Sequence, residues 1–150
     1  GARPSHAVWQ GKVWRKEQLV TVCGLGTVTG LEGANCYHER YPFIPGISKR
    51  NWTDSWLRDM NNKENKPKDF NGKEYTVYEA KQKQRKMETS MRAQREKVQL
   101  LKDGNADQEI IMLERAKYRG QLSEYCAFSK KMGLRQERER IYLDGKGRIA

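Results

Sequence analysis

From residue 77 to residue 101 a series of mostly apolar positions recurs at alternating steps of three and four, the spacing of a helix that packs along one face, and a second apolar stripe follows from residue 111 to residue 132. The pattern predicts two helices of more than about 25 residues each, separated by the stop at 102–104. Thr76 and Glu79 have the spacing of a capping box, Asn105 is placed to cap the second helix, and Gly133 is placed to end it. A tight turn between two long helices predicts an antiparallel hairpin. The seam positions are Val77, Ala80, Gln84, Met87, Met91, Gln94, Val98 and Leu101, then Ile111, Tyr118, Leu122, Tyr125 and Met132.

The first third of the chain has a different pattern. The β-branched run from Leu19 to Cys23 ends at Gly24 and predicts a short strand, and 26–30 is either a second short strand or a bend. Pro42 and Pro45 exclude a helix interior around them. Residues 1–50 are therefore expected to form a compact, Gly-rich unit of short strands and turns.

Two further segments complete the chain. In 51–75, Thr53 can cap a short helix that places Trp52 and Trp56 on one side, and a polar linker follows. In the tail, 134–150, polar and apolar residues alternate over 138–145, which predicts a short strand returning to the first unit. The predicted fold class is α+β: a small strand-and-turn unit (1–50), a short helix and linker (51–75), a helical hairpin (76–133) and a tail.

The composition favours elongated helices over a thick core. Hydrophobic residues make up 36% of the chain and charged residues 33%, and 30 Lys and Arg stand against 19 Asp and Glu, a net charge of +11. That balance suits nonspecific contact with nucleic acid, although an ordinary solvated helix face would have the same composition. No apolar run is long enough for a membrane span, and no signal-peptide pattern is present. The candidate phosphate contacts are Lys81, Lys83, Arg85, Lys86, Arg92, Arg95 and Lys97.

Both histidines and two of the three cysteines lie in the first third of the chain and have the ligand types of a zinc site. His6, Cys23, Cys36 and His38 would make a Cys₂His₂ set. Their spacing differs from that of a common zinc finger, because a single residue separates Cys36 from His38. The alternative is that Cys23 is buried in a strand while His6 and His38 hydrogen-bond to backbone groups. An odd number of cysteines argues against a disulfide framework.

The same residues allow a second chemical hypothesis. A metal-independent ribonuclease needs a proton acceptor, a proton donor and a cation for the phosphate. His6, His38 and Arg3 have suitable side chains. No catalytic motif of strict spacing accompanies them, and two histidines can equally be structural.

Several motifs together resemble one protein family. In order along the chain they are GARPSHAVWQGKV (1–13), GANCYH (33–38), YPFIPGIS (41–48), GKEYTVYEA (72–80) and FSKKMGLR (128–135). This series resembles the C-terminal part of the tailed-phage minor capsid protein 2 family. It is more distantly similar to the head-morphogenesis domain of Mu-type phages, which typically ends in a Cys-Arg-Cys turn where this chain has Cys36-Tyr37-His38.

The resemblance implies a function that the composition alone does not. It implies a virion protein present in few copies near the portal, which serves head assembly or DNA packaging and is found in the host cytoplasm during assembly. Portal and capsid proteins are the implied partners, with nonspecific contact to DNA. It also implies a fragment, since family members carry a longer N-terminal region. Related proteins sometimes carry toxin domains, so an effector ribonuclease is the alternative function.

Overall fold

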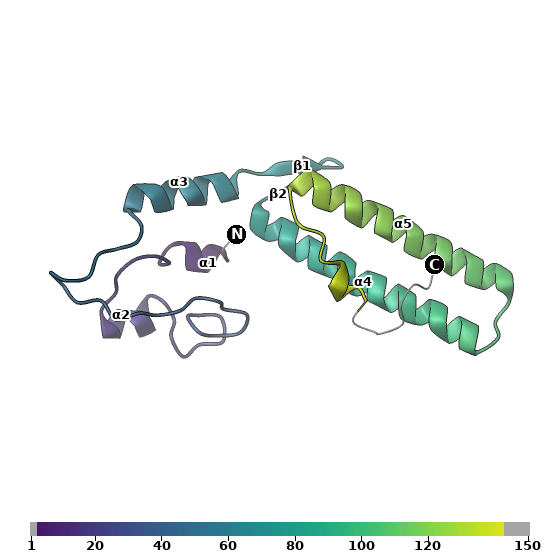
Figure 1. Cartoon of the computed structure of the whole chain (residues 1–150), viewed down its shortest axis with the longest axis horizontal. Helices are drawn as coiled ribbons and strands as arrows, with labels where there is room; N and C mark the ends of the chain where they lie inside the picture. The colour runs from purple at the N-terminus through teal and green to yellow at the C-terminus, as the bar shows by residue number, and fades with distance from the viewer. Residues whose placement is uncertain (1–2, 143–150) are drawn as a thin grey trace. The chain divides into compact units, whose positions relative to one another are not determined.

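Two long antiparallel helices form the largest element of the computed structural model, which describes residues 3–142 (Figure 1). Helix α4 spans Val77–Asp103 and helix α5 spans Gln108–Met132. The Thr76 hydroxyl accepts from the backbone N–H of Glu79, whose carboxylate accepts from the N–H of Thr76, so the predicted capping box is confirmed. No helix within the described residues is both long and apolar enough to cross a membrane.

The turn between the two helices differs from the prediction in one detail. Asp107, not Asn105, caps α5, because its carboxylate accepts from the backbone N–H of Glu109. Asn105 instead takes a left-handed backbone conformation, with φ of 50°, that reverses the chain. Gly133 ends α5 with φ of 69°, as predicted.

A two-stranded antiparallel sheet precedes the helical pair. Strands β1 (Lys68–Phe70) and β2 (Lys73–Tyr75) pair with Phe70 opposite Lys73. Asn71 and Gly72 connect them with φ of 53° and 77°, the two positive values that a tight two-residue hairpin turn requires. Phe70 and Tyr75 both meet the ring of Phe128 edge-on, at 5.1 and 5.4 Å between centroids.

The interior between α4 and α5 is unusually polar. Met91 and Val98 are fully buried, but so are Glu88 and Arg95, at 2% and 0% exposure. The guanidinium carbon of Arg95 lies 4.7 Å from the ring centre of Tyr142 and 5.9 Å from that of Tyr118. An arginine buried among aromatic rings retains favourable interactions with their faces, which offsets part of the cost of leaving water.

The segment after α5 packs on the helical hairpin. A short 3₁₀ helix, η1, spans Arg138–Arg140, and Ile141 is fully buried with Met91, Tyr118 and Tyr125. The predicted strand is therefore wrong over 138–142, and the part of that prediction at 143–150 lies outside the described residues. The Tyr125 hydroxyl holds the segment, accepting from the backbone N–H of Glu137 at 2.8 Å and donating to Glu88 at 3.1 Å. Burial, with Glu88 nearby, raises the pKa of Tyr125 to about 12.

Residues 3–66 belong to a compact unit of their own, the first unit, and the chain divides between Lys66 and Pro67. Its helices are α1 (Pro4–Ala7), α2 (Lys16–Thr21) and α3 (Asp54–Asn65). The predicted strand at 19–23 is wrong: most of it belongs to α2, and within 3–66 the structure has no strand. Local helical hydrogen bonds won because no neighbouring strand is available to pair with this β-branched run.

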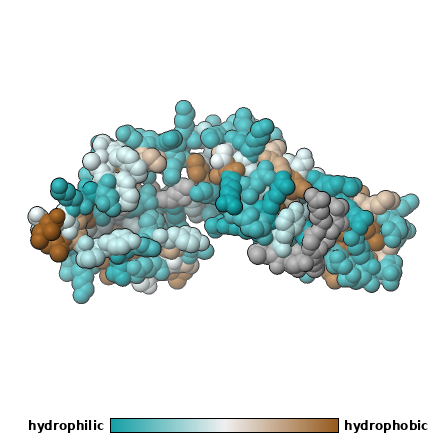
Figure 2. Space-filling view, in the orientation of Figure 1, coloured by the Kyte–Doolittle hydropathy of each residue, from teal (hydrophilic) through white to brown (hydrophobic). Residues whose placement is uncertain are grey.

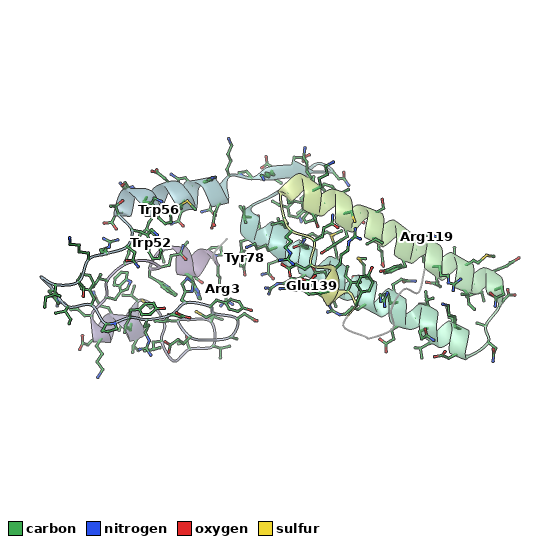
Figure 3. All side chains as sticks on the ribbon, in the orientation of Figure 1. Arg3, Trp52, Trp56, Tyr78, Arg119 and Glu139 are labelled. Carbon is green, nitrogen blue, oxygen red and sulfur yellow. The ribbon has the colours of Figure 1, made fainter. Side chains whose placement is uncertain are left out.

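Helix α3 follows the sequence prediction. The Thr53 hydroxyl accepts from the backbone N–H of Trp56. Trp52 and Trp56 stack, with ring centroids 5.8 Å apart (Figure 3). All four tryptophans of the chain lie in residues 3–66, so indole fluorescence reports on this unit alone. The fold class α+β with a helical hairpin is confirmed, with the described strands at 68–75.

Replacing Ile141 by Ala tests whether the C-terminal segment stabilises the helical hairpin. Because Ile141 is fully buried, the change should lower the free energy of unfolding by about 2–5 kcal/mol, measured by urea denaturation followed by far-UV circular dichroism. Ile110, on α5 but 48% exposed, gives the matched Ile→Ala control and should change it by less than about 0.5 kcal/mol. Equal effects of the two variants would show that the segment does not dock on the hairpin.

Candidate functional site

Helix α1 places His6 in the interior of the first unit. Pro4 is the first residue of α1, where a backbone N–H would have no partner within the helix, so the N–H that proline lacks is not missed. His6 is 3% exposed. Its Nε2 lies 2.8 Å from the carbonyl oxygen of Thr29. Arg3, labelled in Figure 3, donates to the same Thr29 carbonyl at 2.9 Å and to the Ala34 carbonyl at 3.1 Å. The start of the chain is thus tied to the loop around residues 29–34.

Close backbone turns shape that loop. A Cβ atom at Gly30 would lie 2.0 Å from the Gly24 carbonyl oxygen, so only glycine permits this approach. Glu32 and Asn35 adopt positive φ values of 60° and 56°. Glu32 also forms an ion pair with Arg40, with 2.6 Å between Oε1 and Nε. The result is a coiled segment that delivers Cys36 and His38 to α1.

Three side chains converge at this point. The Nδ1 atoms of His6 and His38 are 3.4 Å apart, and the Cys36 sulfur lies 3.4 Å from Nδ1 of His38 and 4.0 Å from Nδ1 of His6. Imidazole nitrogen and thiolate sulfur are the ligands that most often bind zinc in proteins. The cluster combines one buried and two half-buried residues.

The outer ring nitrogens of the histidines are also engaged. Nε2 of His38 lies 3.0 Å from the side-chain oxygen of Gln10, while Nε2 of His6 faces Thr29. The indole of Trp9 covers both rings, at 4.6 Å from His6 and 4.9 Å from His38 between centroids. Burial, and then the neighbouring His6, lower the pKa of His38 below its usual range, so the neutral ring is favoured.

Cys23, the fourth residue of the predicted metal set, does not belong to this cluster. It is 2% exposed and packs with Trp9 and Leu31 in an apolar cluster. Burial raises the pKa of its thiol, so the neutral form that packs like a small apolar side chain is favoured. Three of the four predicted ligands therefore meet, and the fourth lines the adjacent core.

The residues of the ribonuclease hypothesis also lie together, but their partners favour structural roles. The Arg3 guanidinium is occupied by two backbone carbonyls, and His6 and His38 each engage a protein oxygen through Nε2. No observed contact of these three residues favours phosphate chemistry over holding the loop.

The predicted phosphate contacts on α4 divide into two groups. Arg95 is fully buried and is excluded as a phosphate contact. It was predicted as one because a charged side chain on a helix is expected to be solvated. Lys97 pairs with Glu114 at 3.0 Å, and Arg92 donates to the Arg140 carbonyl at 2.9 Å. Lys81, Arg85 and Lys86 are exposed and Lys83 is half-buried.

Glu114 and Glu88 are buried acids that sequence reasoning missed. Glu114 accepts from Lys117 and Gln94 and pairs with Lys97, and these contacts lower its pKa to about 2. A pattern could have revealed the polar interior of α4. Steps of four and three from Gln84 pass through Glu88, Met91, Arg95 and Val98, all of them buried.

Comparison with known proteins gives one result. A family model described as phage minor capsid protein 2 matches residues 1–127, most of the chain. The same comparison found no curated protein and no solved structure with significant similarity to this chain. The matched range includes the whole His/Cys cluster, α4 and most of α5.

Acid titration should expose the network around Glu114. Its carboxyl binds a proton more weakly in the folded chain than in the unfolded one, so the free energy of unfolding should fall as the pH drops from about 4.5 to about 2. In Glu114→Gln this dependence should be shallower, as measured by urea denaturation of the helical signal across that range. Glu124→Gln, an exposed position on the same helix, should retain the full dependence. An unchanged slope in Glu114→Gln would contradict the assignment.

Proposed function

The chain belongs to the phage minor capsid protein 2 family. On that premise we propose that it joins the phage head through the end of its helical hairpin at which the turn connects α4 to α5. Family membership makes it a capsid-related protein of the virion. The proposal adds the surface: the end of the α4–α5 pair binds a portal or capsid protein while the head is assembled in the host cytoplasm.

The distribution of exposed apolar side chains supports this choice. Within residues 67–142, the exposed large apolar residues are Leu100, Ile110, Met112 and Leu113, between 48% and 64% exposed. All four lie beside the turn that joins α4 to α5. Figure 2 shows hydrophobic surface at this end of the hairpin among hydrophilic residues. Apolar side chains gathered at one end of an otherwise charged element are typical of a protein interface.

Replacing Met112 and Leu113 by Glu should abolish co-purification with the portal or major capsid protein of the same phage. The two side chains are 56% and 57% exposed, so the helical circular dichroism should be unchanged. Ile44 and Ile47, exposed apolar residues of the first unit, provide the matched double Glu control and should leave association intact. Loss of association in the control but not in the hairpin variant would assign the interface to the first unit.

We further propose that the exposed cations of α4 contact DNA without reading its sequence. Lys81 and Arg85 are four residues apart and share one face of the helix, with Lys86 on the neighbouring face. Lys and Arg contacts of this kind neutralise phosphates and release bound counterions. Because Arg95 and Lys97 are engaged within the hairpin, the proposed site is small and its affinity modest.

With two or three phosphates neutralised, the logarithm of the DNA-binding constant should fall with the logarithm of salt concentration with a slope of about −2 to −3. Lys81→Gln with Arg85→Gln should reduce the magnitude of that slope by about 2, as measured by fluorescence anisotropy with duplex DNA. Lys130→Gln with Lys131→Gln, a pair of exposed cations at the end of α5, is the charge-matched control. Equal reductions in both variants would show that the contact is not localised on α4.

A further inference from the structure

Within the described residues, the apolar core of the first unit is too small to hold its irregular loops in one arrangement. Within residues 3–66, the buried apolar side chains are Trp9, Cys23, Leu31 and Leu57. The segment 22–50 has no helix or strand and is arranged by isolated backbone hydrogen bonds, such as those from Leu31 to Cys23 and from Ala34 to Val28. Units of this kind commonly depend on a crosslink, and a metal ion is one such crosslink.

The separations within the His/Cys cluster fit a tetrahedral metal centre. Zinc with Zn–N distances of about 2.0–2.1 Å and a Zn–S distance of about 2.3 Å places two nitrogen ligands about 3.4 Å apart and a nitrogen and a sulfur about 3.6 Å apart. The observed separations are 3.4 Å between the two Nδ1 atoms, and 3.4 and 4.0 Å from these nitrogens to the Cys36 sulfur. One ion can therefore reach all three atoms with small side-chain adjustments.

The hydrogen bonds around the cluster place lone pairs, not protons, at its centre. The Thr29 carbonyl can only accept, so Nε2 of His6 carries the proton and Nδ1 presents a lone pair. For His38 the acceptor is the Gln10 side-chain oxygen. The amide orientation of Gln10 is supported on its other side, where its nitrogen donates to Asn61 Oδ1 at 3.5 Å. Asn61 is itself oriented by donating to the Ala7 carbonyl.

Two Nδ1 lone pairs facing each other at 3.4 Å repel unless something positive lies between them. A single thiol proton on Cys36 can serve one of the two nitrogens and not both. A cation bound by both nitrogens and the thiolate satisfies all three atoms at once. The outer bonds to Thr29 and Gln10 are the supporting hydrogen bonds that commonly fix the tautomer and orientation of metal-binding histidines.

We propose that His6 Nδ1, Cys36 Sγ and His38 Nδ1 bind one Zn²⁺ ion, with water as the fourth ligand, and that this ion fastens α1 to the 29–38 loop. Two imidazoles with one thiolate suit zinc, whereas magnesium and calcium prefer oxygen ligands. Cys23 is not a ligand in this proposal, because the ligand atoms that lie within 4.8 Å of one another are those of His6, Cys36 and His38. The site does not depend on the proposed portal or DNA contacts.

Metal analysis of the full chain, purified without a metal-affinity step, tests the site directly. Elemental analysis by inductively coupled plasma mass spectrometry should find about one zinc per chain in the native protein and in the Cys23→Ala and Cys126→Ala variants. Cys36→Ala should have lost it. The three variants are matched, since each removes one thiol. Far less than one zinc in the native protein, another metal in its place, or full retention in Cys36→Ala would overturn the proposal.

Cobalt substitution counts the thiolates and remains informative if Cys36→Ala fails to fold. The native protein loaded with Co²⁺ should show a thiolate-to-cobalt charge-transfer band whose intensity is unchanged in Cys23→Ala. A band halved in Cys23→Ala would make Cys23 a second thiolate ligand and overturn the three-residue site. Chelation of zinc should lower the unfolding temperature followed by tryptophan fluorescence, because all four tryptophans lie in the first unit. An unfolding temperature that does not respond to chelation would contradict the fastening role.

Discussion

The scarcity of apolar residues governs how this chain folds. With 36% hydrophobic residues, neither unit can fill its interior with aliphatic side chains, so polar and charged groups must be buried. A buried polar group costs free energy unless it finds partners. In the helical hairpin the burial of Gln84, Glu88 and Arg95 therefore comes with specific contacts: Gln84 donates to Ser129 and Arg135, Glu88 accepts from Tyr125, and Arg95 lies over aromatic rings. These contacts also fix the register of the two helices.

The first unit meets the same constraint in a different way. Its loops are too irregular to bury many side chains, and its small apolar cluster of Trp9, Cys23 and Leu31 packs beside two imidazoles and a thiol. Arg3, His6 and His38 each use a donor to hold a carbonyl or amide oxygen of the loops. A zinc ion at the centre of this arrangement would supply the crosslink that a larger apolar core supplies elsewhere.

Membership of the phage minor capsid protein 2 family places both units in a capsid-related protein. A protein of the virion needs surfaces that persist in an assembly. The hairpin presents an apolar end and an exposed cationic face on rigid helices, and the first unit presents turns held by side-chain contacts. The buried cation Arg95 shows that part of the positive charge supports the fold and is not available to a partner.

The sequence alone determined what depends on neighbours in the chain. The Thr76–Glu79 capping box, the Thr53 cap and the Gly133 stop follow from residue types at fixed spacing, since each is a local interaction. Tertiary structure decided what depends on distant partners. Most of the run 19–23 entered α2 because no strand of the described residues lies beside it. Arg95 became a core residue because Tyr118 and Tyr142 arrive from other segments, and Cys36 rather than Cys23 joined the histidines because the glycine turns aim it there. Local spacing carries no information on which remote groups a folded chain brings together.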